Sequence, residues 1–348
     1  MYRRIIKPLL FLLAPETIHK LLIRFLKFAF AIPGIRILVH RSYHISDPVL
    51  ETDFLGMKFS NPVGLAAGFD KNAEVYREFS AFGFSFIEIG TLTPLGQPGN
   101  PKPRSFRIPV DKGLINRMGF NNKGAEMAAL NLERKRPDGL ILGGNLGKNT
   151  TTSNEDAVAD YEAVFRAIYN GVDYFVVNVS CPNISDLRKL QDQDSLEAIL
   201  GRVLEIRKEM EVKKPVLLKI SPDLNEKQLD ETIEIVERLG IDGIVATNTT
   251  VSREGLLTSK EKVDSIANGG LSGAPMTKRS LEVVRYISKK TGGKMPLIAV
   301  GGIMSVQDAL NMLDAGATLI QIYTGFIYEG PGLANKINKA ILKQRKQA

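Results

Sequence analysis

Eight short apolar segments recur along the chain from residue 62 onward. They cover residues 62–67, 84–89, 140–144, 174–179, 215–220, 243–246, 296–300 and 318–322. Continuous apolar runs of this length are typical of strands that are buried on both faces, as in a parallel sheet. The run at 174–179 is the clearest, because Pro182 follows it and proline cannot donate a backbone hydrogen bond to a sheet.

Amphipathic segments separate most of these runs and predict helices. The clearest of them cover residues 155–169, 195–211, 226–239, 277–290 and 306–315. Eight alternating strand and helix units predict an α/β fold, a (β/α)8 TIM barrel, in preference to an open doubly wound sheet. Two longer insertions are expected, at 91–139 and at 182–194.

The N-terminal segment has a different pattern, with two short helices predicted at 3–13 and 15–31. The second helix places Ile18, Leu22 and Phe25 on one face and basic residues on the other. Residues 1–46 hold eight basic residues and one acidic residue, which is +7 of the net +8. A basic amphipathic helix pair suits an anionic lipid surface, and no apolar run approaches the ~20 residues that span a bilayer. The alternative is that the helices pack on the body of the protein, and both can hold together.

These patterns divide the chain into two parts. Residues 1–45 are expected to form a membrane-associating helical extension that ends in a linker, which runs from about 34 to 48. Residues 46–348 are expected to form the barrel, preceded by a β-hairpin at 51–59.

Composition excludes several kinds of site. Cys181 is the only cysteine, so neither a disulfide framework nor a cysteine-based metal site is expected. His19, His40 and His44 are the only histidines, so the barrel can use no histidine base and no His-rich metal site. The barrel portion is nearly neutral, which argues against a nucleic-acid partner.

Polar side chains follow the predicted strands, at the end of the barrel where such folds carry their chemistry. Lys71 and Lys219 are joined there by many amides and hydroxyls, but by no pair of carboxylates. This set is unlike a glycosidase or a magnesium-dependent site, and it suits a flat ligand that bears amide or imide groups. Glycine loops at 269–273, 301–302 and 323–326 follow the last three strands and predict a bound phosphate group.

With these residues assembled, the chain resembles dihydroorotate dehydrogenase, in its membrane-associated, quinone-reducing class 2. The matching motifs lie along nearly the whole chain, at residues 66–72, 88–94, 97–104, 115–122, 178–183, 218–220, 246–250, 269–273, 300–302 and 321–326. The resemblance implies an FMN-binding barrel that oxidises (S)-dihydroorotate to orotate in pyrimidine (UMP) biosynthesis, with a membrane quinone as electron acceptor.

The resemblance also implies a role for individual residues. Dihydroorotate would be bound by Lys71, Asn116, Arg117, Met118, Gly119, Phe120, Asn178, Asn183, Asn248 and Thr249. FMN would be held by Ala67, Gly68, Lys71, Thr91, Asn145, Asn178, Lys219 and Thr247, and its phosphate by Gly273, Gly302, Tyr323 and Thr324. The quinone would meet His19, Arg107 and Tyr323.

The catalytic base of the family falls on Cys181, which would remove the C5 proton while the C6 hydride passes to the flavin. Membrane-class members usually carry serine at this position and soluble members cysteine, so the chain combines features of both. A thiol has a reference pKa of about 8.5, far below that of an alcohol, and therefore needs less help to lose its proton.

Three alternatives differ from this interpretation. A soluble-type enzyme would use fumarate, and the N-terminal helices would then be only structural. A phosphate-binding lyase or synthase would need no flavin, and a non-enzymatic membrane scaffold would need none of the polar strand ends. We expect a peripheral protein on the cytoplasmic side of a bacterial inner membrane, and a monomer in preference to an oligomer.

Overall fold

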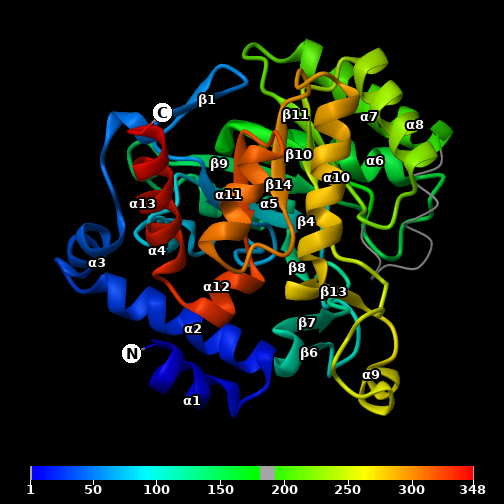
Figure 1. Ribbon diagram of the computed structural model, residues 1–348. Coiled ribbons are helices and arrows are strands. Elements are labelled where there is room, and N and C mark those ends of the chain that lie inside the picture. Colours follow the sequence, from blue (N-terminus) through cyan, green and yellow to red (C-terminus); the bar gives the residue numbers. More distant parts are fainter. Residues whose placement is uncertain (1, 181–192, 348) are drawn as a thin grey trace.

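The computed structural model describes residues 2–180 and 193–347, and its central feature is a closed barrel of eight parallel strands (Figure 1). The strands are β3 (Val63–Leu65), β4 (Phe86–Leu92), β9 (Ile141–Leu146), β10 (Tyr174–Asn178), β11 (Val216–Ile220), β12 (Gly243–Ala246), β14 (Leu297–Val300) and β15 (Leu319–Ile322). Each strand pairs with the next one in this series, and β15 pairs with β3 to close the ring. All eight predicted strands are present, and the predicted barrel is confirmed.

Helices surround the barrel. They are α4 (Tyr76–Ser80), α5 (Ala125–Leu132), α6 (Ala157–Ile168), α7 (Gln193–Glu209), α8 (Glu226–Leu239), α10 (Thr277–Lys290), α11 (Val306–Asp314), α12 (Thr324–Glu329) and α13 (Leu333–Arg345). The five predicted helices correspond to α6, α7, α8, α10 and α11. The ends of α8 show why its sequence is helical there: Asn225 and Gln228 form a reciprocal capping box, and Gly240 ends the helix in a left-handed conformation.

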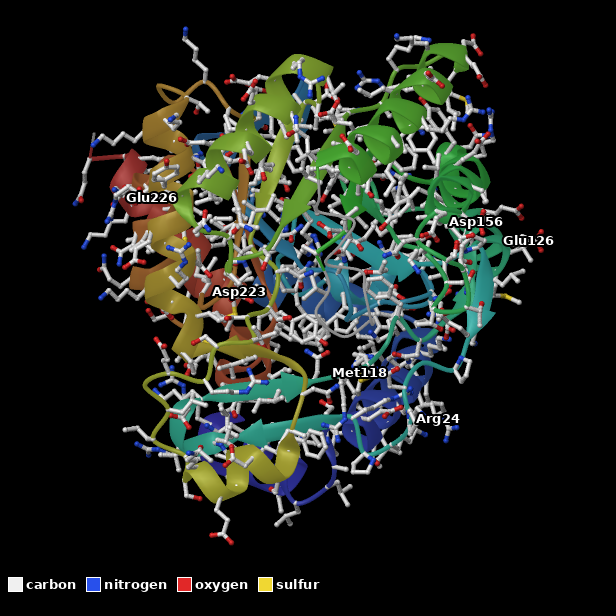
Figure 2. All side chains as sticks on the ribbon, turned by 90° about the vertical axis from the view of Figure 1, so that its right-hand side faces the viewer. Arg24, Met118, Glu126, Asp156, Asp223 and Glu226 are labelled. Carbon is white, nitrogen blue, oxygen red and sulfur yellow. The ribbon has the colours of Figure 1, made fainter. Side chains whose placement is uncertain are left out.

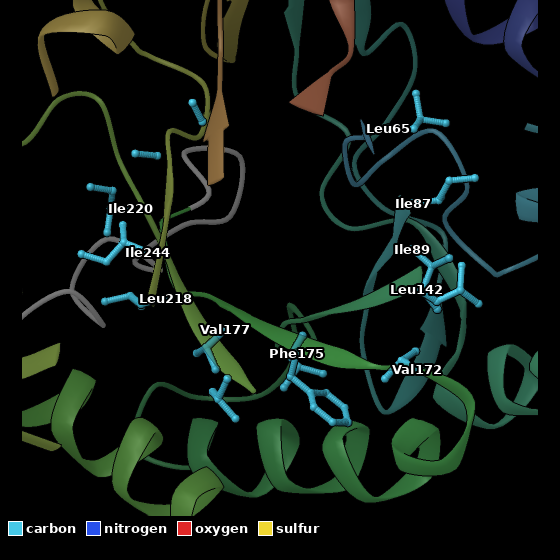
Figure 3. Packing of buried hydrophobic residues seen from close by; sticks show 14 of the residues in the cluster. Leu65, Ile87, Ile89, Leu142, Val172, Phe175, Val177, Leu218, Ile220 and Ile244 are labelled. Carbon is cyan, nitrogen blue, oxygen red and sulfur yellow. The ribbon is translucent and has the colours of Figure 1, made fainter. Parts of the chain in front are cut away.

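Side chains alternate along each strand between the helices and the barrel interior. Phe175 and Val177 of β10 point outward and pack in the layer between strands and helices (Figure 3). Tyr174 and Val176 of the same strand belong to a separate apolar cluster, which fills the interior. Because the alternation continues, Asn178 at the end of β10 faces inward, toward the open end of the barrel.

A β-hairpin packs against the interior cluster of the barrel. Strands β1 (Thr52–Phe54) and β2 (Met57–Phe59) are joined by Leu55 and Gly56, both with positive φ, as a two-residue hairpin turn requires. Phe59 packs edge-on against Phe86 of β4, with ring centroids 5.2 Å apart. The hairpin predicted at 51–59 is confirmed.

The insertion after β4 and the loop after β12 build additional strands over one side of the barrel. They contribute β5 (Leu95–Gln97), β6 (Ser105–Ile108), β7 (Gly113–Asn116), β8 (Asn122–Gly124), α9 (Lys260–Ile266) and β13 (Gly270–Gly273). Strand β7 pairs with both β6 and β13, so segments more than 150 residues apart form one antiparallel sheet. Short 3-10 turns occur at Pro48–Leu50, Pro109–Asp111, Tyr169–Gly171 and Ala274–Met276.

The N-terminal segment is helical and lies beside β6 and α12 (Figure 1). It consists of a π-helical turn (Tyr2–Ile6), α1 (Lys7–Phe11), α2 (Pro15–Ala31) and α3 (Ile35–Tyr43). The expectation of a linker from 34 to 48 is therefore wrong over most of its length. Helix α3 was missed because it is short, carries no side-chain cap and begins after Gly34. Within the described residues, no helix is long and apolar enough to cross a membrane.

Candidate active site

A polar cavity of about 140 Å³ opens at the carboxyl ends of the barrel strands. Most of the predicted site residues line it, although they come from segments throughout the chain. They are Ala67, Gly68, Lys71, Thr91, Asn116, Met118, Gly119, Phe120, Asn178, Lys219, Thr247, Asn248, Thr249, Gly273, Gly302, Tyr323 and Thr324. The strand ends therefore converge as the barrel prediction requires.

Of the described residues predicted to bind substrate or FMN, two are not part of this lining. Asn145 lies just behind it, fully buried, where its side chain accepts a hydrogen bond from Thr91 Oγ1 at 2.5 Å. Arg117 is turned away, because its guanidinium donates to the carbonyls of Ile266 and Asn268. Cys181 and Asn183 lie outside the described residues.

The amides at the strand ends form one connected network. Asn178 Nδ2 lies 3.2 Å from both Thr91 Oγ1 and Asn145 Oδ1, and Asn248 Nδ2 lies 3.2 Å from Asn178 Oδ1. Thr249 Oγ1 is buried beside this network and has no hydrogen-bond partner among the described residues. An unpaired buried hydroxyl costs free energy unless a ligand pairs with it, so Thr249 is available to contact a bound molecule.

A charged cluster forms the floor of the cavity. Lys219 Nζ lies 3.3 Å from Glu88 Oε1, and Gln321 Nε2 donates to Glu88 Oε2 at 2.7 Å. Glu88 and Gln321 were not among the predicted site residues. A signal for Glu88 exists in the sequence, since it is the only charged residue in the apolar run 84–89.

Glycine backbone forms one end of the cavity. Gly273 and Gly302 have φ values of +99° and +71°, which disfavour any side chain. A Cβ on Gly302 would lie 2.3 Å from Thr277 Cα, and one on Gly273 would lie 2.3 Å from Lys112 O. Glycine is therefore required at both positions by close packing of the backbone, and both residues line the cavity.

A second cavity, of about 320 Å³ and mostly apolar, lies between the N-terminal helices and the barrel. Helices α1 and α2 contribute Phe11, Ile18 and Leu22 to its lining, and α12 contributes Phe326. The two cavities share a wall formed by Gly68, Lys71, Asn116, Met118 and Tyr323.

His19 faces the apolar cavity from α2, and its ring packs edge-on against Phe69 with centroids 6.0 Å apart. Burial, assisted by the positive charge of Lys71, lowers the pKa of His19 to about 4. The imidazole is therefore neutral at pH 7 and can both donate and accept a hydrogen bond.

Arg107 and Tyr323 also line the apolar cavity. Arg107 Nη1 donates to the carbonyl of Leu13 at 2.7 Å, and its guanidinium lies 4.3 Å from the centre of the Phe11 ring. Burial raises the pKa of Tyr323 to about 12, so its hydroxyl stays protonated throughout the physiological range. All three predicted quinone residues thus line one cavity.

An ion pair between buried Arg104 and partly buried Glu16 holds α2 against the barrel insertion. Arg104 forms a bidentate pair with Glu16, with N–O distances of 2.9 and 3.0 Å. The Arg104 hydrogen bond lowers the pKa of Glu16 below its ordinary value. Because Glu16 lies one helical turn before His19, this pair sets the position of His19 in the cavity.

Comparison with known proteins gives the family. Residues 49–344 match the family model described as dihydroorotate dehydrogenase. The chain is 48% identical to dihydroorotate dehydrogenase (quinone) of Christiangramia forsetii, over 99% of both chains. It is 45% identical to the enzyme of the same name from Corynebacterium diphtheriae, over 96% of this chain and 91% of the relative.

Solved structures agree with this relationship. The crystal structure of DHODH from Eimeria tenella in complex with ferulenol superposes with a TM-score of 0.83 at 33% identity, covering 96% of this chain and 92% of that one. The ligand-free structure from the same organism gives 0.82 at 35% identity, covering 89% of this chain and 95% of that one. The chain belongs to the dihydroorotate dehydrogenase family.

Proposed function

We propose that this protein oxidises dihydroorotate to orotate in pyrimidine biosynthesis, with FMN as cofactor and a membrane quinone as electron acceptor. The observation that carries the proposal is the pair of cavities with a common wall. One cavity is polar, as a flavin and a pyrimidine require, and the other is apolar, as a lipid-soluble oxidant requires. The names of the relatives support the same reaction.

The residues of the polar cavity suit FMN. Gly273, Gly302 and Thr324 line one part of the cavity and would hold the phosphate; the Thr324 hydroxyl lies 2.8 Å from Ser272 Oγ. Lys219 supplies a positive charge at the cavity floor. FMN, when bound there, would accept the two electrons of the oxidation and pass them on to the quinone.

The substrate would be recognised by charge and by hydrogen bonds. Lys71 would pair with the carboxylate of dihydroorotate, and Asn116, Asn178 and Asn248 would meet its imide groups. Each buried asparagine amide that is left without a partner costs about 1–3 kcal/mol, so a pyrimidine that lacks the imide groups would bind more weakly. Cys181 remains the proposed base for the C5 proton, on the strength of its motif alone.

The quinone would enter from the bilayer through the N-terminal helices. Leu9, Leu12, Phe25 and Phe28 expose their side chains on α2 and the segment before it, interspersed with basic residues. Apolar side chains would enter the lipid and the basic residues would meet anionic headgroups. We place the protein as a peripheral enzyme on the cytoplasmic side of the bacterial inner membrane.

Electron-acceptor specificity tests the proposal. Full-length protein purified in detergent should be yellow, and dihydroorotate should reduce a ubiquinone or menaquinone analogue but not fumarate. Turnover with fumarate and not with quinone would instead support the soluble-type enzyme, and a colourless protein would exclude the flavin.

A cavity-filling variant connects the activity to the apolar cavity. Leu22→Trp fills part of that cavity and should slow quinone reduction at least tenfold, because it occupies the space of the acceptor. Reduction of the bound flavin by dihydroorotate, followed without any acceptor, should be unchanged. The matched control Leu21→Trp lies on the exposed side of the same helix and should alter neither rate.

A further inference from the structure

Glu88 is buried in the barrel beneath the polar cavity, and none of its side chain is exposed. Asn145 Nδ2 and Gln321 Nε2 each donate to it at 2.7 Å, and Lys219 Nζ lies 3.3 Å away. These groups come from β4, β9, β11 and β15, so barrel closure itself brings them together.

The surroundings of Glu88 are those of a carboxylate anion. Among the described residues, both of its oxygens accept hydrogen bonds from N–H donors, an arrangement that suits a carboxylate. Tyr174 faces it from the interior cluster, and burial together with the negative charge of Glu88 raises the pKa of this tyrosine well above 10. An unpaired charge this deeply buried would be strongly destabilising, so Lys219 is its required counter-ion.

Glu88 does not reach the cavity, but two of its partners do. Lys219 and Gln321 both line the polar cavity and both contact the Glu88 carboxylate. Glu88 can therefore influence a bound group in two ways, through the position of Lys219 and through its own negative charge.

We propose that Glu88 is a positioning residue that fixes Lys219 at the cavity floor and offsets its positive charge, which weakens the electron affinity of the flavin bound above. A positive charge near a flavin stabilises the negative charge that the ring gains on reduction, and a nearby carboxylate opposes this effect. The inference rests on the proposed function, because it needs a flavin in the polar cavity.

The affinity of the bound flavin for sulfite tests this proposal without turnover. Sulfite adds to the oxidised ring, bleaches its absorbance and leaves negative charge on the ring, so its dissociation constant responds to nearby charges. Glu88→Gln removes one negative charge with little change of shape. In this variant the side-chain amide of Gln321 can rotate by 180°, so that its oxygen accepts a hydrogen bond from the amide nitrogen introduced at position 88. The Gln321 nitrogen then faces Tyr174.

Glu88→Gln should bind sulfite at least tenfold more tightly at pH 7. The midpoint potential of the flavin should rise with it, and a tenfold change corresponds to about 30 mV for a two-electron couple. The control Glu126→Gln removes the same charge from the exposed surface of α5, at the edge of the molecule (Figure 2), and should leave the dissociation constant unchanged.

A second variant separates the charge effect from misfolding. Glu88→Gln combined with Lys219→Met replaces the buried pair by neutral groups, so that no buried charge is left unpaired. This double variant should bind sulfite less tightly than Glu88→Gln, because the tighter binding of the single variant depends on the unopposed charge of Lys219. An unchanged or weaker affinity after Glu88→Gln, or a double variant that binds sulfite as tightly as Glu88→Gln, would overturn the proposed charge effect. A purified protein without flavin would instead contradict the proposed function.

Discussion

Acidification should loosen the N-terminal helices through His19. The pKa of this histidine is about 4 in the folded protein and near 6.5 in the unfolded chain, so the unfolded chain binds more protons between these values. Stability must therefore fall as the pH falls from about 6.5 toward 4. The full shift of about 2.5 units corresponds to about 3.4 kcal/mol, and at pH 5 the loss reaches about 2 kcal/mol. These values are ceilings, because the side chain is only partly buried from solvent.

Denaturant unfolding of detergent-solubilised protein at pH 7 and pH 5 measures this loss. Circular dichroism is the suitable signal, since the chain contains no tryptophan. The His19→Gln variant cannot titrate at this position, so its stability should fall by about 2 kcal/mol less than that of the wild type between the two pH values. The control variant His40→Gln, on α3, retains His19. The contribution of His19 to the loss of stability between pH 7 and pH 5 should therefore be the same as in the wild type.

Hydrogen exchange locates the effect. Amides of α2 should exchange faster at pH 5 in the wild type than in His19→Gln, after correction for the intrinsic rate. Parallel pH dependence of the wild type and His19→Gln, in both stability and exchange, would refute the assignment of this pKa shift to burial of His19.

Further predictions concern the extension, the tyrosine in the shared wall and the base. Arg104→Met removes the bidentate partner of the partly buried Glu16 carboxylate, which retains Lys20 and Lys102 at 3.5 and 3.8 Å, and should cost about 1.5–3 kcal/mol, measured by denaturant unfolding, with a raised KM for quinone; an unchanged KM would show that the pair does not position the helix. Deleting residues 2–40 should abolish quinone turnover but leave flavin reduction by dihydroorotate intact, and loss of both would show that the extension is needed for the barrel to fold. Because the pKa of Tyr323 is about 12, quinone reduction should show no ionisation of this residue below pH 10, and Tyr323→Phe should leave the pH profile unchanged in shape. Cys181→Ser should retain measurable activity with its pH optimum shifted upward, and an unchanged profile would count against this residue as the base.

The local sequence pattern determined most of the barrel. Strand and helix periodicities depend on residues close together in the chain, so all eight strands and the helices α6, α7, α8, α10 and α11 followed from them. The same alternation placed Asn178 and Lys219 at strand ends. Helix α3 was not predicted because it is only nine residues long, begins after Gly34 and has no side-chain cap.

The tertiary structure alone decided which of these groups meet. Glu88 and Gln321 are 233 residues apart, and only the closure of β15 onto β3 and β4 brings them into contact. The pairing of β7 with β13 and the bidentate contact of Arg104 with Glu16 likewise join distant segments. Periodicity reports which face of a strand or helix is buried but carries no information on its partner, because that depends on the register and packing of the whole chain. The apolar cavity is the clearest case, since the helical extension and the barrel line it together.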